Sequence, residues 1–266
     1  MKKLQTGEFY GTHYQKSAFE NIIITDTEYT HNKVDWHYHE NPYFTYLLQG
    51  KLFEFNKKES YYLEPGSLLF HNWQDAHYNI KPPEYTRGFH IELNEKWFSN
   101  YDIQITDFEG SINIKNPLVN SLMNKVFVES KLNDRYSNLS IETSLIKIFG
   151  SVKETKEKDL KRPLWVKNLQ ELLMEEEIDY SLKNLSSILG IHPIHLSREF
   201  SRYFGTTLGN YIRLQKLNEA FYLLASNKFS MTEICYKCGF YDQSHFISNF
   251  KIVYKTTPYK LLKQIF

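Results

Sequence analysis

Two related segments in the C-terminal part of the sequence constrain the fold more than any other feature. At an offset of 50 residues, REFSRYFGTT at 198–207 aligns with SNFKIVYKTT at 248–257. In this alignment Phe200 matches Phe250, and a Thr-Thr pair closes both copies. A repeat with the same aromatic spacing predicts two copies of one structural unit.

Each copy follows a short helical pattern that ends at a glycine. In the first unit, Ser181 can cap a helix that ends at Gly190, and the apolar residues on one face of this helix are Leu182, Leu185, Ile188 and Leu189. In the second unit, Ser230 and Glu233 predict a capping box before a helix that ends at Gly239. Helix, glycine turn and helix is the layout of a helix-turn-helix.

The second helix of each unit has an apolar face and an opposite face of short polar or basic residues. At 100° per residue, Leu196 and Phe200 share the inner face of the first helix, and Phe246 and Phe250 share that of the second. Short side chains let a helix approach base edges, and basic ones can contact phosphates. The candidate DNA-binding residues of the outer faces are Ile194, Ser197, Arg198, Ser201, Arg202, Ser244, His245, Ser248 and Lys251.

Between the two units, residues 208–225 show an apolar stripe that predicts one long helix. Such a helix would span about 27 Å, and successive major-groove turns on one face of DNA lie about 34 Å apart. From residue 183 to the end there are 11 basic and 4 acidic residues, a net charge of +7 that suits a polyanion. A protein-interaction array is an alternative, although such arrays usually need at least three repeats.

Residues 181–265 resemble the DNA-binding domain of the AraC/XylS transcription regulators. The resemblance lies in LSSILGIHPIHLSREFSRYFGTTLGNYI and MTEICYKCGFYDQSHFISNFKIVYKTTPYKLL. It implies that the second helix of each unit enters a major groove, and it places base-facing positions at Ile194, Ser197, Arg198, Gln243, Ser244, His245 and Ser248. Two residues depart from the pattern of this family. His192 stands where a Ser or Thr cap is usual, and Ser248 stands where Arg is common. The departure at Ser248 implies less sequence discrimination by the second unit.

The first hundred residues predict a different architecture. They contain short aromatic and β-branched segments separated by turn signals, namely YFTYLLQ, KLFEF, ESYYL, SLLFH and TRGFHIEL. This spacing is typical of a β-barrel or sandwich. Residues 116–131 and 140–152 then show helical spacing, and we expect this helical hairpin to mediate dimerisation through Leu145, Ile148, Phe149 and Val152.

A charged segment, KETKEKDLKRP at 153–163, separates the two architectures. We place a linker at 156–163 within it. This predicts a cupin-like ligand-sensing and dimerisation domain at 1–155 and an all-α double helix-turn-helix domain at 164–266.

Histidines mark a candidate site in the first domain. His37 and His39 lie two residues apart on a predicted strand, and His77 follows later, a trio that can bind a metal. The segment resembles the cupin-like sensor domain found ahead of AraC/XylS DNA-binding domains, and metal-binding cupins share this layout. Their motif also has a glutamate near the position of Tyr43, and none is present here. We therefore expect no metal and no cofactor, and the histidines are either structural or part of a small-molecule pocket. The expected ligand-binding residues are His37, His39, Tyr43, Tyr46, His77, His90 and Glu92.

The composition of the sequence argues against a membrane-spanning or a secreted protein. The sequence has no run of about 18 apolar residues that could span a bilayer, and its first residues lack the apolar segment of a secretory signal, so we expect a cytoplasmic protein. Cys235 and Cys238 form a C-x-x-C without a second pair, and we expect both in the core.

The sequence predicts a DNA-binding transcription regulator and not an enzyme. Its expected partners are promoter DNA, a small-molecule effector bound in the N-terminal barrel, RNA polymerase and a second copy of the chain. The alternative is a metal-dependent cupin enzyme with an accessory helical domain.

Overall fold

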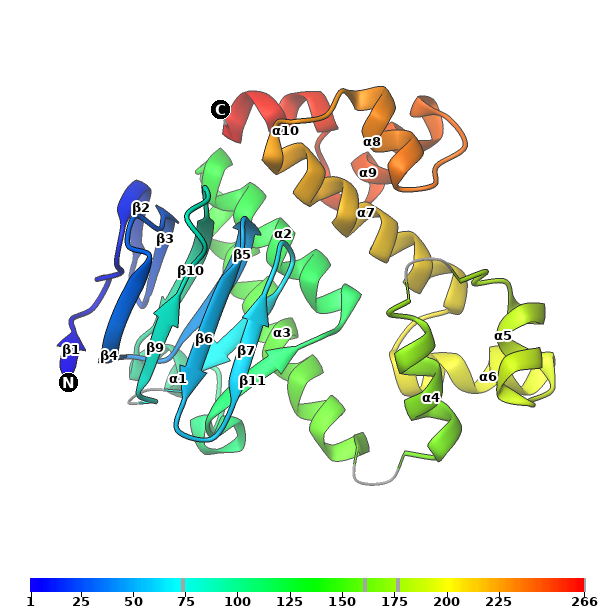
Figure 1. The fold of residues 1–266 in the computed structure, drawn as a ribbon, viewed down its shortest axis with the longest axis horizontal. Coiled ribbons are helices and arrows are strands. Elements are labelled where there is room, and N and C mark those ends of the chain that lie inside the picture. The colour runs from blue at the N-terminus through cyan, green and yellow to red at the C-terminus, as the bar shows by residue number, and fades with distance from the viewer. Residues whose placement is uncertain (73–74, 160–161, 176–177, 266) are drawn as a thin grey trace.

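The computed structural model describes residues 1–72, 75–159, 162–175 and 178–265, and its N-terminal half contains two facing sheets (Figure 1). One sheet has the strand order β1-β4-β9-β6-β7, and the other has the order β11-β8-β5-β10-β3-β2. Neighbouring strands are antiparallel apart from β1 and β4, which are parallel. The strands are β1 (Lys2–Leu4), β2 (Thr12–Phe19), β3 (Ile22–Glu28), β4 (Lys33–His39), β5 (Tyr43–Gln49), β6 (Leu52–Asn56), β7 (Ser60–Leu63), β8 (Leu68–His71), β9 (His77–Ile80), β10 (Arg87–Leu93) and β11 (Ser111–Ile114).

Strand β5 is covered on both of its faces. Successive side chains of a strand point to opposite sides. Leu47 packs inside the barrel with Leu52 and Leu63 of the other sheet. Phe44 points outward, and its ring centroid lies 5.3 Å from that of Phe149. Burial on both faces explains why this strand is a continuous apolar run in the sequence rather than an alternating one.

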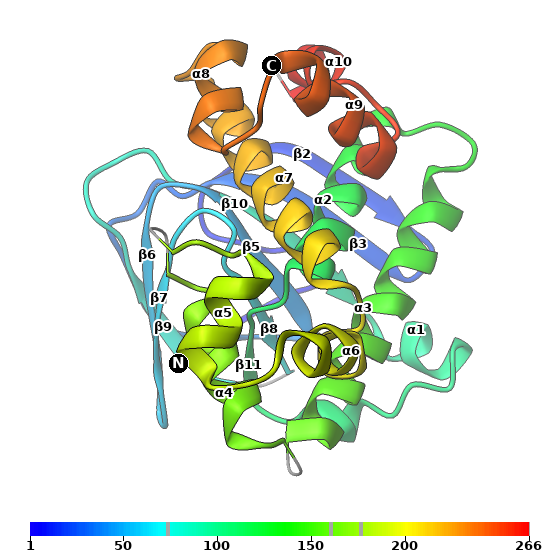
Figure 2. The same ribbon diagram turned by 90° about the vertical axis from the view of Figure 1, so that its right-hand side faces the viewer.

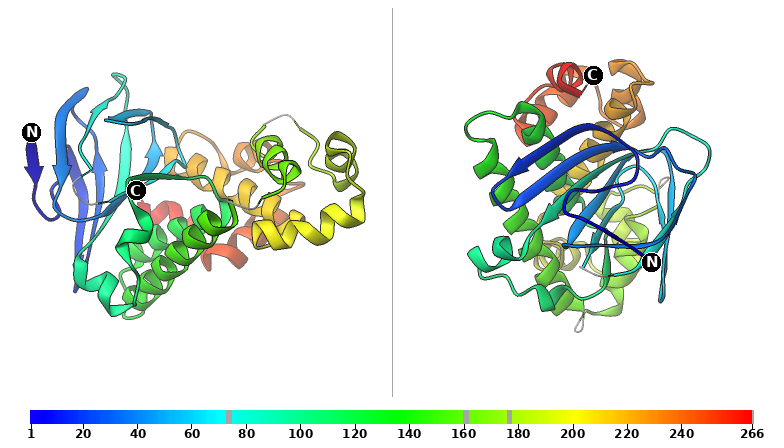
Figure 3. Two further views of the ribbon diagram at one scale, coloured as in Figure 1. Left: turned by 90° about the horizontal axis from the view of Figure 1, so that it is seen from below. Right: turned by 90° about the vertical axis from the view of Figure 1, so that its left-hand side faces the viewer.

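Two helices, α2 (Pro117–Leu132) and α3 (Ser137–Asp159), cover the outer face of the six-stranded sheet (Figure 3). Two short elements, α1 (Glu95–Asn100) and the 3-10 helix η1 (Ile105–Phe108), add to this layer. Phe149 of α3 lies at the centre of an aromatic cluster, and its ring centroid is 5.0–5.4 Å from those of Phe44, Phe70, Trp97, Phe98 and Phe108.

The dimer contact expected from the sequence is wrong. Its four residues are buried in the core of the chain itself: Leu145, Ile148, Phe149 and Val152. Side chains that already pack inside one chain cannot cover the surface of a second. Dimerisation stays a prediction, and it needs another surface.

The segment between the two halves contains more helix than the sequence indicated. Helix α3 continues to Asp159, so residues 156–159 of the expected linker are helical. Residues 160 and 161 lie outside the described residues. Pro163 is the N-cap of the next helix, α4 (Leu164–Leu172).

Over its described residues, the C-terminal half consists of helices and connecting loops, without strands. It contains α4, α5 (Leu182–Leu189), α6 (Pro193–Phe204), α7 (Leu208–Ser226), α8 (Met231–Lys237), α9 (Gln243–Tyr254) and α10 (Pro258–Ile265). Helices α4 to α6 lie at one end of the long helix α7, and α8 to α10 lie at the other (Figures 1 and 2). The predicted architecture, a β-barrel with a helical hairpin followed by an all-α domain with two helix-turn-helix units, agrees with the structure. None of the described helices is long and apolar enough to cross a membrane.

The two helix-turn-helix units differ in how they join the rest of the molecule. Helix α7 contacts both α2 and β5, and α2 also contacts α9 and α10. One hydrophobic core therefore continues from the sheets through α2 and α3 into α7, α8, α9 and α10. It includes Cys235 and Cys238, as expected. The first unit has a separate core around Leu185, Leu196 and Phe200.

A buried polar network lies within the shared core. Asn124 of α2 donates to Asn218 of α7 at 3.1 Å and to the hydroxyl of Tyr254 of α9 at 3.1 Å. The Tyr46 hydroxyl of β5 lies 2.6 Å from Asn124 Oδ1 and 2.7 Å from the Tyr222 hydroxyl. Because unpaired polar atoms are costly inside a protein, this network favours one specific docking of the helical half.

We predict that Phe149→Ala lowers the free energy of unfolding by about 3–5 kcal/mol, because it leaves a cavity among five aromatic rings. Denaturant unfolding of the full chain measures this loss. Ile146→Ala on the same helix is the control, since Ile146 is 37% exposed and should change stability by less than about 1 kcal/mol. Equal effects of the two substitutions would contradict the buried position of Phe149.

We further predict that Asn124→Ala destabilises the protein by about 1–3 kcal/mol, because three buried partners lose a hydrogen bond. Amide hydrogen exchange should show faster exchange in α7 and α9, where two of those partners lie. Asn138→Ala, on the exposed start of α3, is the matched control. Unchanged exchange in both helices would show that the network does not hold the two halves together.

Candidate functional site

Local capping defines where the helices of the first unit begin and end. Ser181 accepts a hydrogen bond from the Asn184 amide at 3.2 Å, and α5 ends at Gly190, whose φ of +64° is left-handed. Helix α6 starts at Pro193, with His192 as N-cap, and His192 Nδ1 accepts from the Ile194 amide at 3.3 Å. An imidazole thus performs the capping role of the usual Ser or Thr.

The second unit is built in the same way with different residues. The capping box of Ser230 and Glu233 is present at the start of α8, as predicted. Gly239 follows α8 with a φ of +66°, a conformation that favours glycine. Asp242 then caps α9 by accepting from the His245 amide at 2.7 Å. The sequence analysis missed this cap, although an Asp before a helical pattern is a typical N-cap.

The outer faces of α6 and α9 lie on the surface of the molecule. Leu196 and Phe200 of α6, and Phe246 and Phe250 of α9, are fully buried. The opposite side chains are exposed: Ile194, His195, Ser197, Arg198, Ser201, Arg202, Ser244, His245, Ser248 and Lys251. The structure therefore leaves both candidate reading faces free for a ligand.

Three details alter the expected pattern. Gln243 is half-buried, and its amide donates to Thr232 of α8 at 2.6 Å, so it braces the unit as well as bordering the outer face. Ile188 was expected on the inner face of α5 and is 51% exposed, whereas Leu185 is fully buried. In α6, Glu199 Oε1 lies 3.6 Å from Arg198 Nε, and Glu199 Oε2 lies 3.3 Å from Arg202 Nη1. Both arginine side chains stay more than 70% exposed beside Glu199.

Comparison with known proteins agrees with this geometry. Residues 185–264 match the family described as a helix-turn-helix domain. The chain is 27% identical over 219 residues to the transcriptional activator RhaS of Mannheimia succiniciproducens, covering 75% of this chain and 78% of that protein. It is 37% identical over 70 residues to the xylose operon regulatory protein of Escherichia coli K12, covering 26% of this chain and 18% of that protein. The C-terminal half of the chain is thus similar to the helix-turn-helix part of transcription regulators.

The match that extends over nearly the whole chain is to a solved structure, and it is weak. Apo ToxT of Vibrio cholerae aligns with a TM-score of 0.40 at 13% identity, over 91% of this chain and 98% of that one. A likeness at this level is too low to carry an argument about ligands.

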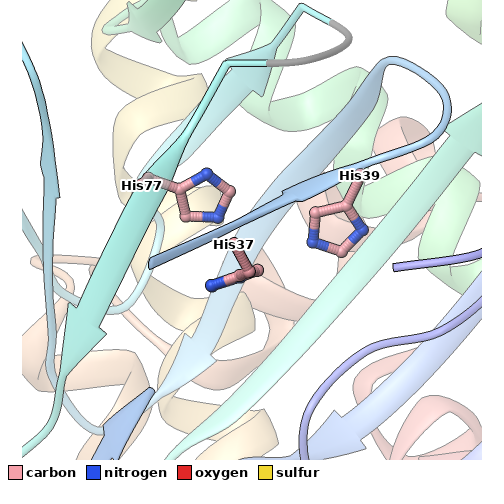
Figure 4. A group of neighbouring side chains, drawn as sticks. All are labelled: His37, His39 and His77. Carbon is pink, nitrogen blue, oxygen red and sulfur yellow. The ribbon is translucent and has the colours of Figure 1, made fainter. Parts of the chain in front are cut away.

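The barrel gathers most of the residues expected to bind a ligand. His37 and His39 of β4, His77 of β9, Tyr43 of β5 and His90 of β10 line one cavity. Figure 4 shows the rings of His37, His39 and His77 close together. Further lining residues that the sequence analysis did not select include Phe9, Tyr29, Thr45, Glu54 and Asn79.

Two of the expected residues lie elsewhere. Tyr46 faces away from the cavity, toward Asn124 of α2, because it has the opposite strand parity to Tyr43. Glu92 is not among the lining residues of the cavity, and it accepts hydrogen bonds from the Gly7 amide at 2.6 Å and from Asn41 Nδ2 at 2.8 Å. Glu92 therefore anchors the N-terminal segment.

Burial controls the charge state of the cavity. Desolvation lowers the pKa of His37 to about 4 and that of His90 to about 3, so both are neutral at physiological pH. Burial also raises the pKa of the Glu54 carboxyl to about 8. The cavity has a volume of about 30 Å³, whereas sites for organic ligands usually measure about 300 Å³ or more. An organic effector would enter only if the barrel opened.

We predict that Arg198→Ala weakens binding to a specific DNA site by about 1–3 kcal/mol, because a bidentate contact to guanine is worth that much. A binding titration on specific and on scrambled duplexes measures the effect. Arg135→Ala makes the same change of charge at the exposed α2–α3 turn and should leave both affinities unchanged. Equal binding by the Arg198 variant and the wild type would remove this role.

Proposed function

We propose that this regulator binds promoter DNA with α6 and α9 in successive major grooves on one face of the duplex. The supporting observation is that two helices with exposed polar faces lie at opposite ends of α7. A helix of 19 residues spans about 28 Å, close to the distance of about 34 Å between groove turns.

The two reading helices have different expected roles. In α6, Arg198 and Ser197 are proposed to read base edges, with Ile194 in apolar contact. In α9, Ser244, His245 and Ser248 face outward and no arginine accompanies them, so this helix is proposed to contribute less discrimination. Lys251 and Arg202 are proposed to contact phosphates, which set affinity rather than sequence preference.

The remaining partners belong to the same proposal. A cytoplasmic location follows from promoter binding. A second copy of the chain would pair through a surface other than the buried residues of α3, and RNA polymerase would be contacted from the bound promoter. An effector would act through the N-terminal half, because that half shares a core with α7 and α9. The similarity to RhaS and to the xylose operon regulatory protein supports a regulator rather than the enzyme alternative.

Selection from a pool of random duplexes tests the two-helix contact without knowledge of the promoter. We expect enriched sites with two conserved segments whose centres lie about 10–10.5 base pairs apart. Selection with Arg198→Ala should relax one segment and leave the other unchanged. A single conserved segment in the wild-type selection, or no enrichment at all, would contradict the proposal.

We predict that Lys251→Gln weakens binding to all DNA sequences to a similar degree and reduces the slope of log K against log salt by about one, because one phosphate contact is lost. Titrations at several salt concentrations measure the slope. Lys58→Gln, in an exposed turn of the sensor half, makes the same change of charge and should leave the slope unaltered. A loss of affinity that differs between DNA sequences would instead indicate that Lys251 contacts a base.

A further inference from the structure

We propose that the N-terminal half of the chain contacts the DNA backbone directly, through a cluster of three lysines: Lys125 of α2, Lys147 of α3 and Lys255 at the end of α9. The inference rests on the proposed function, because it takes α9 to lie on DNA. It adds a contact surface of which two lysines lie outside both helix-turn-helix units.

The three lysines influence one another and have no acidic partner. Partial burial lowers the pKa of Lys125, and repulsion from Lys147 and Lys255 lowers it further. Among the residues that the structure describes, no carboxylate forms a salt bridge with any of the three. The sequence has 32 basic and 31 acidic residues, so an excess of basic residues does not explain the cluster. Repulsion between like charges opposes folding, and a bound polyanion would relieve it.

The cluster continues the outer face of α9. Ser244, Ser248, Lys251 and Lys255 are all exposed, and they follow one another at intervals of four, three and four residues. This spacing places them on one side of a helix. Lys255 is the C-cap of α9, so it lies one turn beyond Lys251, the residue proposed to contact a phosphate. Lys255 therefore connects the outer face of α9 with Lys125 of the N-terminal half.

Packing holds the helices that carry these lysines side by side. Helix α2 contacts α9 directly. Lys125 and Lys147 line a surface hollow of about 610 Å³, which Ile252 and Val253 of α9 also line. In the left view of Figure 3, the green helices α2 and α3, the orange-red α9 and the yellow α6 lie along the same side of the molecule. DNA bound to the outer face of α9 would thus lie next to the lysines of α2 and α3.

The exposure and type of the side chains favour phosphates as their partner. Lys147 and Lys255 are exposed, and Lys125 is half-buried with a long aliphatic stem that lets its amine reach solvent. A lysine acts as a mobile point charge, which suits a phosphate better than the edge of one particular base. A small organic anion in the hollow is the rival partner, since about 610 Å³ could hold one. Continuity with Lys251 favours DNA instead, because the cluster extends a basic surface that the proposed function already places on the duplex.

Salt-dependent titration of the full-length protein tests the contact, with a duplex enriched in the selection described above. Each phosphate contact contributes about 0.9 to the slope of log K against log salt. We expect Lys147→Gln to reduce this slope by about one, and the double variant with Lys125→Gln to reduce it by about two. The loss should be similar on specific and on scrambled duplexes. Lys147→Arg keeps the charge and should keep the slope.

Lys96→Gln is the matched control. Lys96 is an exposed lysine of α1, a helix that belongs to the N-terminal half and lies far from α9 (Figures 1 and 2). This variant should have the slope of the wild type. Circular dichroism verifies that each variant is folded, and the single substitution of the exposed Lys147 decides the matter if the double variant does not fold.

Chemical acetylation of lysines, followed by mass spectrometry of the wild type, gives a second measurement. Duplex DNA should protect Lys125 and Lys147 from acetylation and leave Lys96 unprotected. Protection by inorganic phosphate but not by the duplex, at equal ionic strength, would assign the cluster to a small anion and overturn the proposal. Normal DNA binding with an unaltered slope for Lys147→Gln would overturn it as well. Absence of DNA binding by the wild type would instead contradict the proposed function, and this inference with it.

Discussion

The packing of α7 against β5 and α2 is the contact on which the rest of the structure depends. Helix α7 connects the two helix-turn-helix units, and its C-terminal half lies in the core of the N-terminal half. Apolar side chains form most of this contact. The hydrogen-bond network around Asn124 and Asn218 requires a specific alignment of α7 with α2. The position of both reading helices relative to the barrel therefore follows from one helix.

The two helix-turn-helix units are connected to this contact in different ways. Helices α8, α9 and α10 share the core of the N-terminal half, whereas α5 and α6 pack in a core of their own with Leu169 of α4 and Tyr211 of α7. A movement of the sheets would displace α9 through its contact with α2. It would displace α6 only if α7 moved as well, because α6 contacts α7.

Local signals in the sequence were sufficient for the elements of the C-terminal half. Caps such as Ser181 and the box at Ser230 depend on residues only three positions away, and the repeat duplicated the pattern. In the N-terminal half the sequence predicted β5, β6, β7, β8 and β10 but not their sides, and it did not predict β2, β3 or β9. Tyr46 was assigned to the cavity because both faces of β5 are apolar, so parity could not be judged from composition.

The candidate cavity could be predicted only in part for a related reason. His37, His39 and His77 are visible as a group in the sequence, but Glu54 stands between two phenylalanines and has no such signal. The structure places Phe53 and Phe55 on the outside, against Tyr62 and Tyr78. Pairing of β6 with β9 brings Glu54 to the histidines, and this pairing depends on distant segments of the chain.

The shared core also determines what would happen if the chain were cut between α3 and α4. A fragment containing only the C-terminal helices would expose to water the side of α7 that carries Leu217 and Phe221, both fully buried in the intact protein. Such a fragment would aggregate more readily than the full chain. A single proteolytic nick at that point, by contrast, would leave two pieces joined without a covalent bond, because the same apolar surface continues to hold them together.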